Sequence, residues 1–199
     1  MNYSRSFYTA VVSGVVLAAV GCLVALVVFP LQYAAEARLL VTPRAVAGVD
    51  PYTSSKAAER IAQNLAEVVQ TSQFFARVIS APGTSIDQTY FPSDELERRK
   101  LWIKTAEAGV TYNTGILRIV AYHPKKDQAV AIATTIAGVL AGTGNDFAVN
   151  SADYRIVDTA VASKYPKKPN FPAIAVGAFL LGFAVSFVYS VSHKRSIFG

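Results

Sequence analysis

The side chains that most often carry catalysis are few in this chain and far apart. Two histidines, His123 and His193, are separated by a long stretch of sequence, and the single cysteine, Cys22, lies in an apolar run. Two isolated histidines without cysteines beside them do not make a metal site. One cysteine also excludes a disulfide within the chain. The sequence therefore predicts no bound metal and no other cofactor.

Motifs for phosphate binding and for nucleophilic catalysis are also missing. The chain has no Walker-type glycine-rich loop, which argues against a nucleotide-driven motor or a kinase of that type. No motif frames a serine or an aspartate as a nucleophile, and we expect Asp127 and Asp146 to cap or solvate helix ends. Because no set of side chains meets the geometric roles of an active site, we expect a protein that is not an enzyme.

Two long runs at the ends of the chain contain no charged residue. They are Ser6–Pro30 and Pro169–Ser192, in a chain that is 52% hydrophobic. Each run exceeds the roughly 20 apolar residues that a helix needs to cross a bilayer. A cleaved signal peptide or a lipoprotein signal ending at Gly21-Cys22 are the alternatives for the first run. Its 25 uncharged residues are too many for a usual signal core, and it stays apolar after Cys22. We therefore predict two retained transmembrane helices.

The charges that flank the two runs predict an orientation. Arg5 precedes the first run, and Lys194 and Arg195 follow the second. Short basic flanks stay in the cytoplasm, so we expect both termini there and the middle of the chain outside the cell (inner or plasma) membrane. The predicted segments are a cytoplasmic N-terminal tail (1–6), transmembrane helix 1 (7–30), an extracytoplasmic domain (31–163), a proline-rich juxtamembrane strut (164–170), transmembrane helix 2 (171–192) and a cytoplasmic C-terminal tail (193–199).

The middle of the chain is only mildly basic. It holds all 13 acidic residues and 16 of the 19 basic ones, a difference of +3. A dedicated nucleic-acid surface normally shows a concentrated basic patch, so we expect no nucleic-acid partner. The length of the segment is enough for one compact domain.

Hydrophobic periodicity predicts an α+β domain. Apolar alternation indicates strands, and apolar residues at helical spacing indicate helices. The expected order is a strand (33–42), a helix that begins at Thr53 or Ser54 and extends to Ile79, a short helix capped by Ser93, two strands (107–112 and 116–122) joined by Asn113-Thr114-Gly115, a helix that begins at Pro124 and ends at Gly142 and Gly144, and a strand (154–160). Without the short helix this is β-α-β-β-α-β, the ferredoxin-like pattern. We expect its first and last strands at the centre of one antiparallel sheet.

Three groups of residues are candidates for contacts with the membrane or with other subunits. Pro166, Pro169 and Pro172 recur every third residue, which favours an extended strut. This strut is either a stiff spacer or the element that sets the tilt of the second helix in an assembly. Its lysines can meet lipid phosphates. Arg98, Arg99 and Lys100 are either a solvated helix face or a contact to a subunit or an anionic ligand. Gly177 and Gly182 lack GxxxG spacing but allow close helix contact.

Several of these segments together resemble the polysaccharide co-polymerases. They are the two terminal runs, Ala37–Val41 directly after the first run, Asn113–Val120 before a helix, and the strut. This family comprises the Wzz-type chain-length determinants and the membrane adaptors of capsule biosynthesis. The short middle domain and the short C-terminal tail resemble the small adaptors without a kinase, although the Ser-Pro-Lys element of many members is missing.

The resemblance implies a function in the cell envelope. It implies a membrane-anchored homo-oligomeric ring that regulates the chain length, polymerisation or export of a surface polysaccharide. The implied partners are a polysaccharide polymerase or exporter, and it stays open whether a separate cytoplasmic tyrosine kinase is another. The alternative is a two-span sensor or adaptor whose outer domain binds a ligand or a partner protein. A third hypothesis, a membrane-bound enzyme, would depend on Asp127 or His123.

Overall fold

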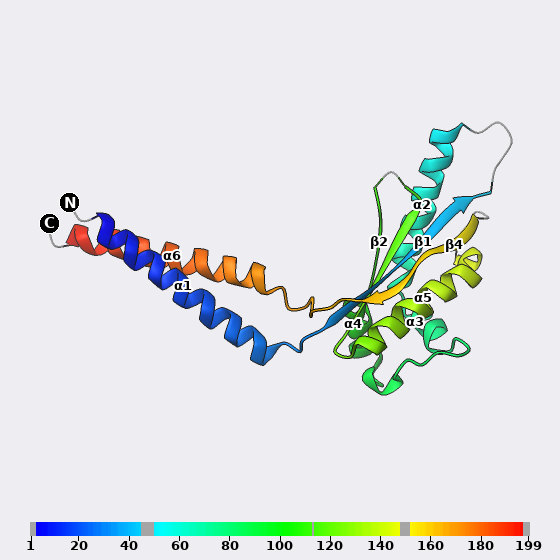
Figure 1. Cartoon of the computed structure of the whole chain (residues 1–199), viewed down its shortest axis with the longest axis horizontal. Coiled ribbons are helices and arrows are strands. Elements are labelled where there is room, and N and C mark those ends of the chain that lie inside the picture. Colours follow the sequence, from blue (N-terminus) through cyan, green and yellow to red (C-terminus); the bar gives the residue numbers. More distant parts are fainter. Residues whose placement is uncertain (1–2, 45–49, 113, 148–151, 197–199) are drawn as a thin grey trace. The chain divides into compact units, whose positions relative to one another are not determined.

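The computed structural model describes residues 3–44, 50–112, 114–147 and 152–196. They form two compact units, which are drawn in Figure 1. One unit is Gln32–Pro166, called the outer domain below. The other combines the segments 1–31 and 167–199 and is called the helical hairpin. Its two helices are α1 (Tyr3–Val28) and α6 (Phe171–Ser196).

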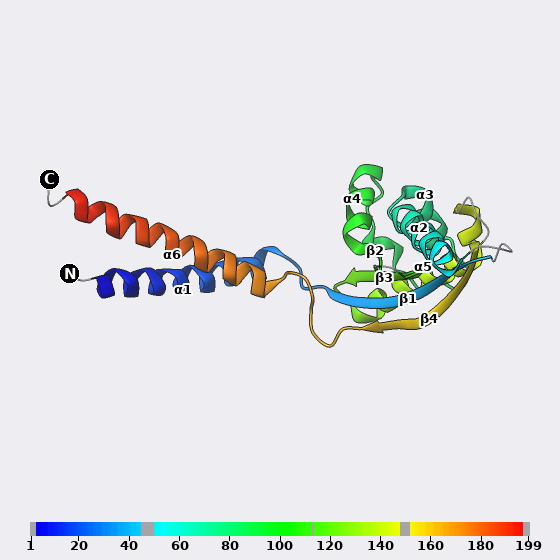
Figure 2. The ribbon, with the colours of Figure 1, turned by 90° about the horizontal axis from the view of Figure 1, so that it is seen from above.

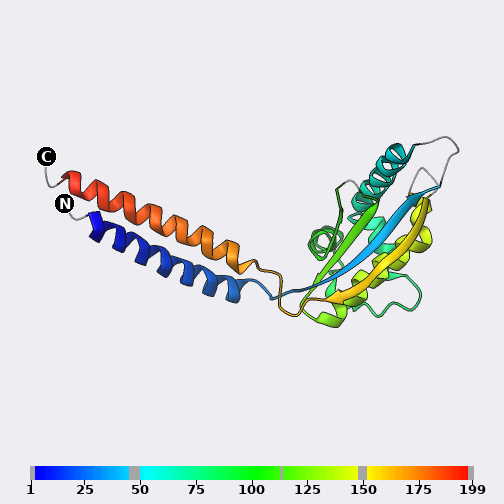
Figure 3. The same cartoon turned by 45° about the horizontal axis from the view of Figure 1, so that its top comes forward.

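The two helices of the hairpin are antiparallel and lie side by side (Figures 1 and 3). Small residues make this close approach feasible. The hydroxyl of Ser13 donates a hydrogen bond to the carbonyl oxygen of Gly182 at 3.0 Å. A Cβ atom added to Gly14 would come within 2.9 Å of the Phe179 ring. In an apolar solvent such close backbone packing is a main source of helix association.

Both helices are long and apolar enough to cross a membrane. The apolar windows are Phe7–Val28 and Phe171–Tyr189, with mean hydropathies of 2.9 and 2.2. These windows agree with the predicted spans, although α1 begins earlier, at Tyr3. Residues 1–2 and 197–199 of the two predicted tails lie outside the described residues.

The outer domain is built on a four-stranded antiparallel sheet with the order β2-β3-β1-β4. The strands are β1 (Tyr33–Pro43), β2 (Ala106–Val110), β3 (Ile116–His123) and β4 (Ala152–Ala162). We expected the first and last strands at the centre. This is wrong for β4, which is an edge strand, while β3 lies beside β1. Ile119, Val120 and Ala121 of β3 are all buried, as in a central strand. By contrast, β4 carries Asp153, Arg155 and Asp158, and charged side chains are usual on edge strands.

The register brings three strand ends together. Tyr33 pairs with His123, and Ala35 pairs with Ala162. The start of β1 and the ends of β3 and β4 therefore form one end of the sheet, called the base of the sheet below. Both chain connections to the helical hairpin leave from this base, because β1 and β4 are antiparallel neighbours.

The helices of the outer domain cover one face of the sheet (Figure 2). Their bounds are α2 (Pro51–Val69), α3 (Ser72–Ile79), α4 (Glu95–Thr105) and α5 (Lys126–Phe147), with a short 3-10 turn, η1 (Gln88–Tyr90). Alternate residues of β1 face these helices. Ala35, Ala37, Leu39 and Val41 are buried in one core with residues of α2 and α5. The residues between them, such as Glu36 and Arg38, face away from the core.

The structure corrects several predicted helix ends. Asp50, not Thr53 or Ser54, caps α2, because its carboxylate accepts from the backbone N–H of Tyr52 and Thr53. Asp94, not Ser93, caps α4 by the same kind of bond. The predicted helix to Ile79 is two helices, since Thr71 accepts from the N–H of Phe74 and begins a new one.

The prediction that α5 ends at Gly142 and Gly144 is also wrong. This helix continues to Phe147, because single glycines inside a helix cost only about 1 kcal/mol each. Gly144 has a packing reason, since a Cβ there would come within 2.7 Å of the Tyr154 ring. The predicted turn between β2 and β3 includes Asn113, which lies outside the described residues.

We predict that Gly115→Ala destabilises the outer domain by about 1–3 kcal/mol, the usual cost of overpacking. A Cβ at this position would overlap the carbonyl oxygen of Val41 and come within 2.9 Å of the Ala58 Cβ. Denaturant unfolding of the full chain in detergent measures the loss. Gly109→Ala is the control, because a Cβ there meets nothing within 4 Å. Equal stability of the two variants would contradict the close approach at Gly115.

Candidate functional site

His123 lies at the base of the sheet and is buried, with 4% of its surface exposed. Its Nδ1 atom lies 3.0 Å from the backbone nitrogen and 3.3 Å from the carbonyl oxygen of Lys125. The ring lies edge-on to Tyr90, with 4.3 Å between ring centroids. Burial lowers the pKa of the His123 imidazole, and this effect exceeds that of the nearby Asp87 carboxylate, which raises it.

The other candidate catalytic residues lie apart from His123. Asp127 is exposed in the first turn of α5. Asp146, near the other end of the same helix, forms an ion pair with Arg77. Across the residues that the structure describes, no three His, Cys, Asp or Glu side chains gather as metal ligands do.

The basic run on α4 separates into residues with different surroundings. The Arg98 guanidinium lies 5.6 Å from the centroid of the Phe75 ring and donates to the carbonyl oxygen of Ser93. Lys100 forms an ion pair with Glu97 at 2.9 Å. Arg99 is exposed and makes no ion pair within the described part of the chain. It borders a shallow groove with Thr71 and Ile103. Of the three residues, Arg99 is the most available to a partner.

The two glycines of α6, Gly177 and Gly182, also have different surroundings. Gly182 is buried against α1, where a Cβ would come within 3.0 Å of the Gly14 Cα and the Ser13 carbonyl oxygen. Its role is thus taken by a contact within the chain. Gly177 is exposed, and a Cβ there would meet nothing within 4 Å. Contact with another subunit stays a prediction for Gly177.

The strut falls at the boundary between the two units. Pro166 is the last residue of the outer domain, and Pro169 and Pro172 belong to the helical hairpin. Pro172 is the second residue of α6, where the missing N–H of proline is tolerated. Asn170 caps this helix, since its side chain accepts from the N–H of Ala173 at 3.3 Å. The strut prolines therefore include a helix start as well as an extended segment.

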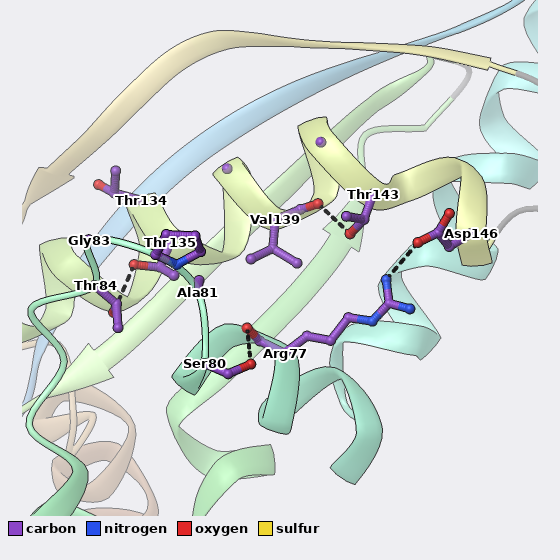
Figure 4. Close-up of a pocket in the computed structure, with 13 residues that line it drawn as sticks. Arg77, Ser80, Ala81, Gly83, Thr84, Thr134, Thr135, Val139, Thr143 and Asp146 are labelled. Carbon is purple, nitrogen blue, oxygen red and sulfur yellow. Dashed lines mark hydrogen bonds and ion pairs between the residues drawn. The ribbon is translucent and has the colours of Figure 1, made fainter.

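A groove lies between α5 and the loop after α3 on the outer domain (Figure 4). It is open to solvent, with a volume of about 730 Å³. Its floor on α5 includes Gly138 and Gly142, and a Cβ at either position would meet nothing within 4 Å. Arg77 and Asp146 close one end with an ion pair of 2.8 Å. Arg77 also lies 4.5 Å from the centroid of the Phe147 ring.

Hydroxyl groups give the groove its polarity. Thr135 and Thr143 each donate to a backbone carbonyl four residues earlier in α5, at 2.8 Å. Across the groove, the Ser80 hydroxyl donates to the carbonyl oxygen of Ala76. Because these protons are used within the helices, the oxygen lone pairs are available to donors of a ligand. The groove thus combines hydroxyl acceptors, glycine backbone and one Arg–Asp pair.

Sequence reasoning missed this groove for a physical reason. The spacing Thr134, Gly138, Gly142 places small residues on one face of α5, which is a visible signal. We interpreted Gly142, together with Gly144, as the end of the helix. Only the packing of the loop after α3 beside this face makes it a groove.

The face of the sheet opposite the helices carries a group of charged side chains. Glu36 lies between Arg38, at 3.0 Å, and Arg118, at 4.0 Å. Beside this face, the edge strand β4 exposes large apolar side chains, among them Val157 (59%) and Val161 (68%). An exposed edge strand presents unpaired backbone groups to another chain. This side of the outer domain is therefore a second candidate surface for protein contacts.

No protein-family model matches this chain, and the chain has no match among curated proteins.

We predict that stability of the outer domain falls as the pH falls through about 6.5, the usual pKa of histidine. The folded protein resists protonation of His123, so the unfolded state binds more protons below this pH. Denaturant unfolding at neutral and mildly acidic pH measures the effect. His123→Asn is the control, because it keeps a polar acceptor but removes the titration. An identical pH profile for both proteins would contradict the prediction.

Proposed function

We propose that this protein is a non-enzymatic, oligomeric membrane scaffold that regulates the chain length, polymerisation or export of a cell-surface polysaccharide. In this proposal it belongs with the polysaccharide co-polymerases of the small type without a kinase. Its partners are copies of itself, membrane lipids and a polysaccharide polymerase or exporter. Whether a separate cytoplasmic tyrosine kinase is a further partner stays open.

One observation carries the proposal. Two apolar helices flank a single α+β domain in the sequence. Because β1 and β4 are antiparallel neighbours, both connections to these helices leave from the base of the sheet. Only 11% and 6% of the two apolar windows are buried, whereas the core helix of a soluble protein is mostly buried. Membrane placement of both helices puts the outer domain on one side of the membrane and both termini on the other. The short basic flanks favour the cytoplasm for the termini.

We further propose that the outer domain is a ferredoxin-like unit. The element order, with α3, η1 and α4 as additions between α2 and β2, is β-α-β-β-α-β. All neighbouring strands are antiparallel, and α2 and α5 cover one face. This arrangement supports the split β-α-β pattern. The exposed face and edge of such a sheet are available for packing of subunits side by side.

The mass of the intact complex tests the proposed function. We expect native mass spectrometry of the full chain, after mild extraction, to show a closed ring of several copies. Arg99→Glu should shift the distribution toward smaller species, because it reverses an exposed charge that has no partner within the described chain. Arg60→Glu is the matched control on α2, where the side chain is also exposed. A clean monomer or dimer for the unaltered protein would overturn the proposal.

The groove favours a second candidate function. A two-span sensor or adaptor needs an outer surface that binds a ligand, and the groove of Figure 4 is large and open enough for a small one. Its hydroxyl acceptors and its Arg–Asp pair suit a ligand rich in hydroxyl groups, since both ions of the pair can exchange partners with such groups.

A thermal-shift screen of the full chain against mono- and oligosaccharides tests this candidate. A specific ligand should raise the unfolding temperature, and Gly138→Leu should abolish the shift by filling the groove. This variant should fold normally, because the Cβ position is free of neighbours within 4 Å and leucine favours helix over glycine by about 0.8 kcal/mol. Gly177→Leu on α6 is the control, because its Cβ position is equally free. A shift that survives Gly138→Leu would exclude the groove as the site.

A further inference from the structure

We propose that three lysines at the base of the sheet bind the phosphate groups of anionic membrane lipids. They are Lys125, Lys126 and Lys164, called the basal lysines below. The inference depends on the membrane placement of the proposed function and deepens it by naming the lipid class. Lys164 belongs to the strut, and Lys125 and Lys126 add a pair from a different part of the chain.

The strand register brings the basal lysines together. Lys125 and Lys126 follow the end of β3 at His123, which pairs with Tyr33. Lys164 follows Ser163, whose N–H donates to the carbonyl oxygen of Ala34 at 2.7 Å. The ends of β3 and β4 therefore flank the start of β1. Strands lie about 4.8 Å apart, so two strand spacings, about 10 Å, separate the two backbone positions. Phosphates of adjacent lipid headgroups can meet lysines at this spacing.

Two of the basal lysines lie over tyrosine rings. The Lys126 ammonium is 4.8 Å from the centroid of the Tyr33 ring, and the Lys164 ammonium is 5.5 Å from that of Tyr165. Tyrosine is enriched at membrane–water interfaces, where the ring meets the headgroup region. A lysine over such a ring keeps its remaining N–H groups for a phosphate oxygen, because an ammonium has three donors. The base of the sheet thus repeats one pair, Lys with Tyr, on both sides of β1.

The charges around this end favour an anion. All three basal lysines are exposed. Two carboxylates lie near them, Asp87 and Asp127. The Asp87 carboxylate accepts hydrogen bonds from the N–H and the hydroxyl of Thr89, and these bonds lower its pKa. Asp127 follows Lys126 directly in the first turn of α5. Lys167 and Lys168 come next along the chain after Lys164 and Pro166, so the local balance stays positive.

Chain length limits the distance between this end and the headgroups. β1 begins at Tyr33, five residues after the end of α1 at Val28. Five residues span at most about 18 Å when fully extended. With α1 across a membrane, the base of the sheet therefore cannot lie far from the surface. A basic residue close to an anionic surface strengthens binding by about five-fold, provided that it lies within a Debye length of about 8 Å.

Lipid binding by the full chain tests the inference. The measurement is native mass spectrometry from detergent with added phosphatidylglycerol or phosphatidylcholine. We expect the unaltered protein to retain phosphatidylglycerol in preference. Lys126→Gln with Lys164→Gln should weaken this binding by about 25-fold, five-fold for each lysine, and leave phosphatidylcholine binding unchanged. The matched control is Arg44→Gln with Arg155→Gln, which removes two charges toward the opposite end of the sheet, where Leu40 pairs with Arg155.

Three results would overturn the inference. The first is unchanged phosphatidylglycerol binding in the lysine variant. The second is an equal loss in the arginine control. The third is equal displacement of the lipid by glycerol phosphate in solution, which would indicate a site for soluble phosphate. The same spectra report the mass of the protein complex. A ring without lipid preference refutes only this inference, whereas a monomer that retains the preference refutes only the proposed scaffold.

Discussion

The strand β1 is paired on both sides, with β3 and with β4, and this pairing fixes how the outer domain connects to the rest of the chain. It makes the first and last strands of the outer domain antiparallel neighbours, so the chain enters and leaves at the base of the sheet. A domain with this connectivity can be attached by two helices at one end while its other surfaces stay free. The hydrogen bonds of Ser163 with Ala34 continue this pairing to the last residues before the strut.

The helices cover only one face of the sheet. Two candidate surfaces therefore stay exposed: the opposite face with the edge strand β4, and the groove on α5. The apolar side chains of β1 are satisfied by α2 and α5, and the opposite face carries Glu36 between two arginines. Trp102 connects α4 to the helices before it. Its ring packs against those of Phe75 and Phe91, and its indole N–H donates to the carbonyl oxygen of Val69 at the end of α2, at 2.8 Å. With this side fixed, α5 presents its small residues to solvent as the floor of the groove, and β4 is left as an open edge.

The sequence predicted the parts that depend on local patterns. The two spans, the strands and the main helices follow from hydropathy and periodicity, and the structure confirms an α+β domain between two apolar helices. Helix ends were less predictable, because Asp50, Thr53 and Ser54 are all good caps. The choice among them depends on which carboxylate or hydroxyl actually reaches the free N–H groups. Nothing in the sequence around Gly144 of α5 indicates that the Tyr154 ring lies against this residue.

The apolar segments, the charged segments and the turns could be predicted from the residues alone, because these properties belong to short stretches of chain. Which segments meet depends on how the whole domain folds. In the folded protein, β4 is an edge strand, and Gly182 packs inside the hairpin whereas Gly177 is exposed. Arg98 and Lys100 have contacts within the domain that Arg99 lacks. Folding also brings Lys126 and Lys164 to one end from distant parts of the chain. Such meetings depend on strand order and register, which are set by the packing of the whole core and not by any single segment.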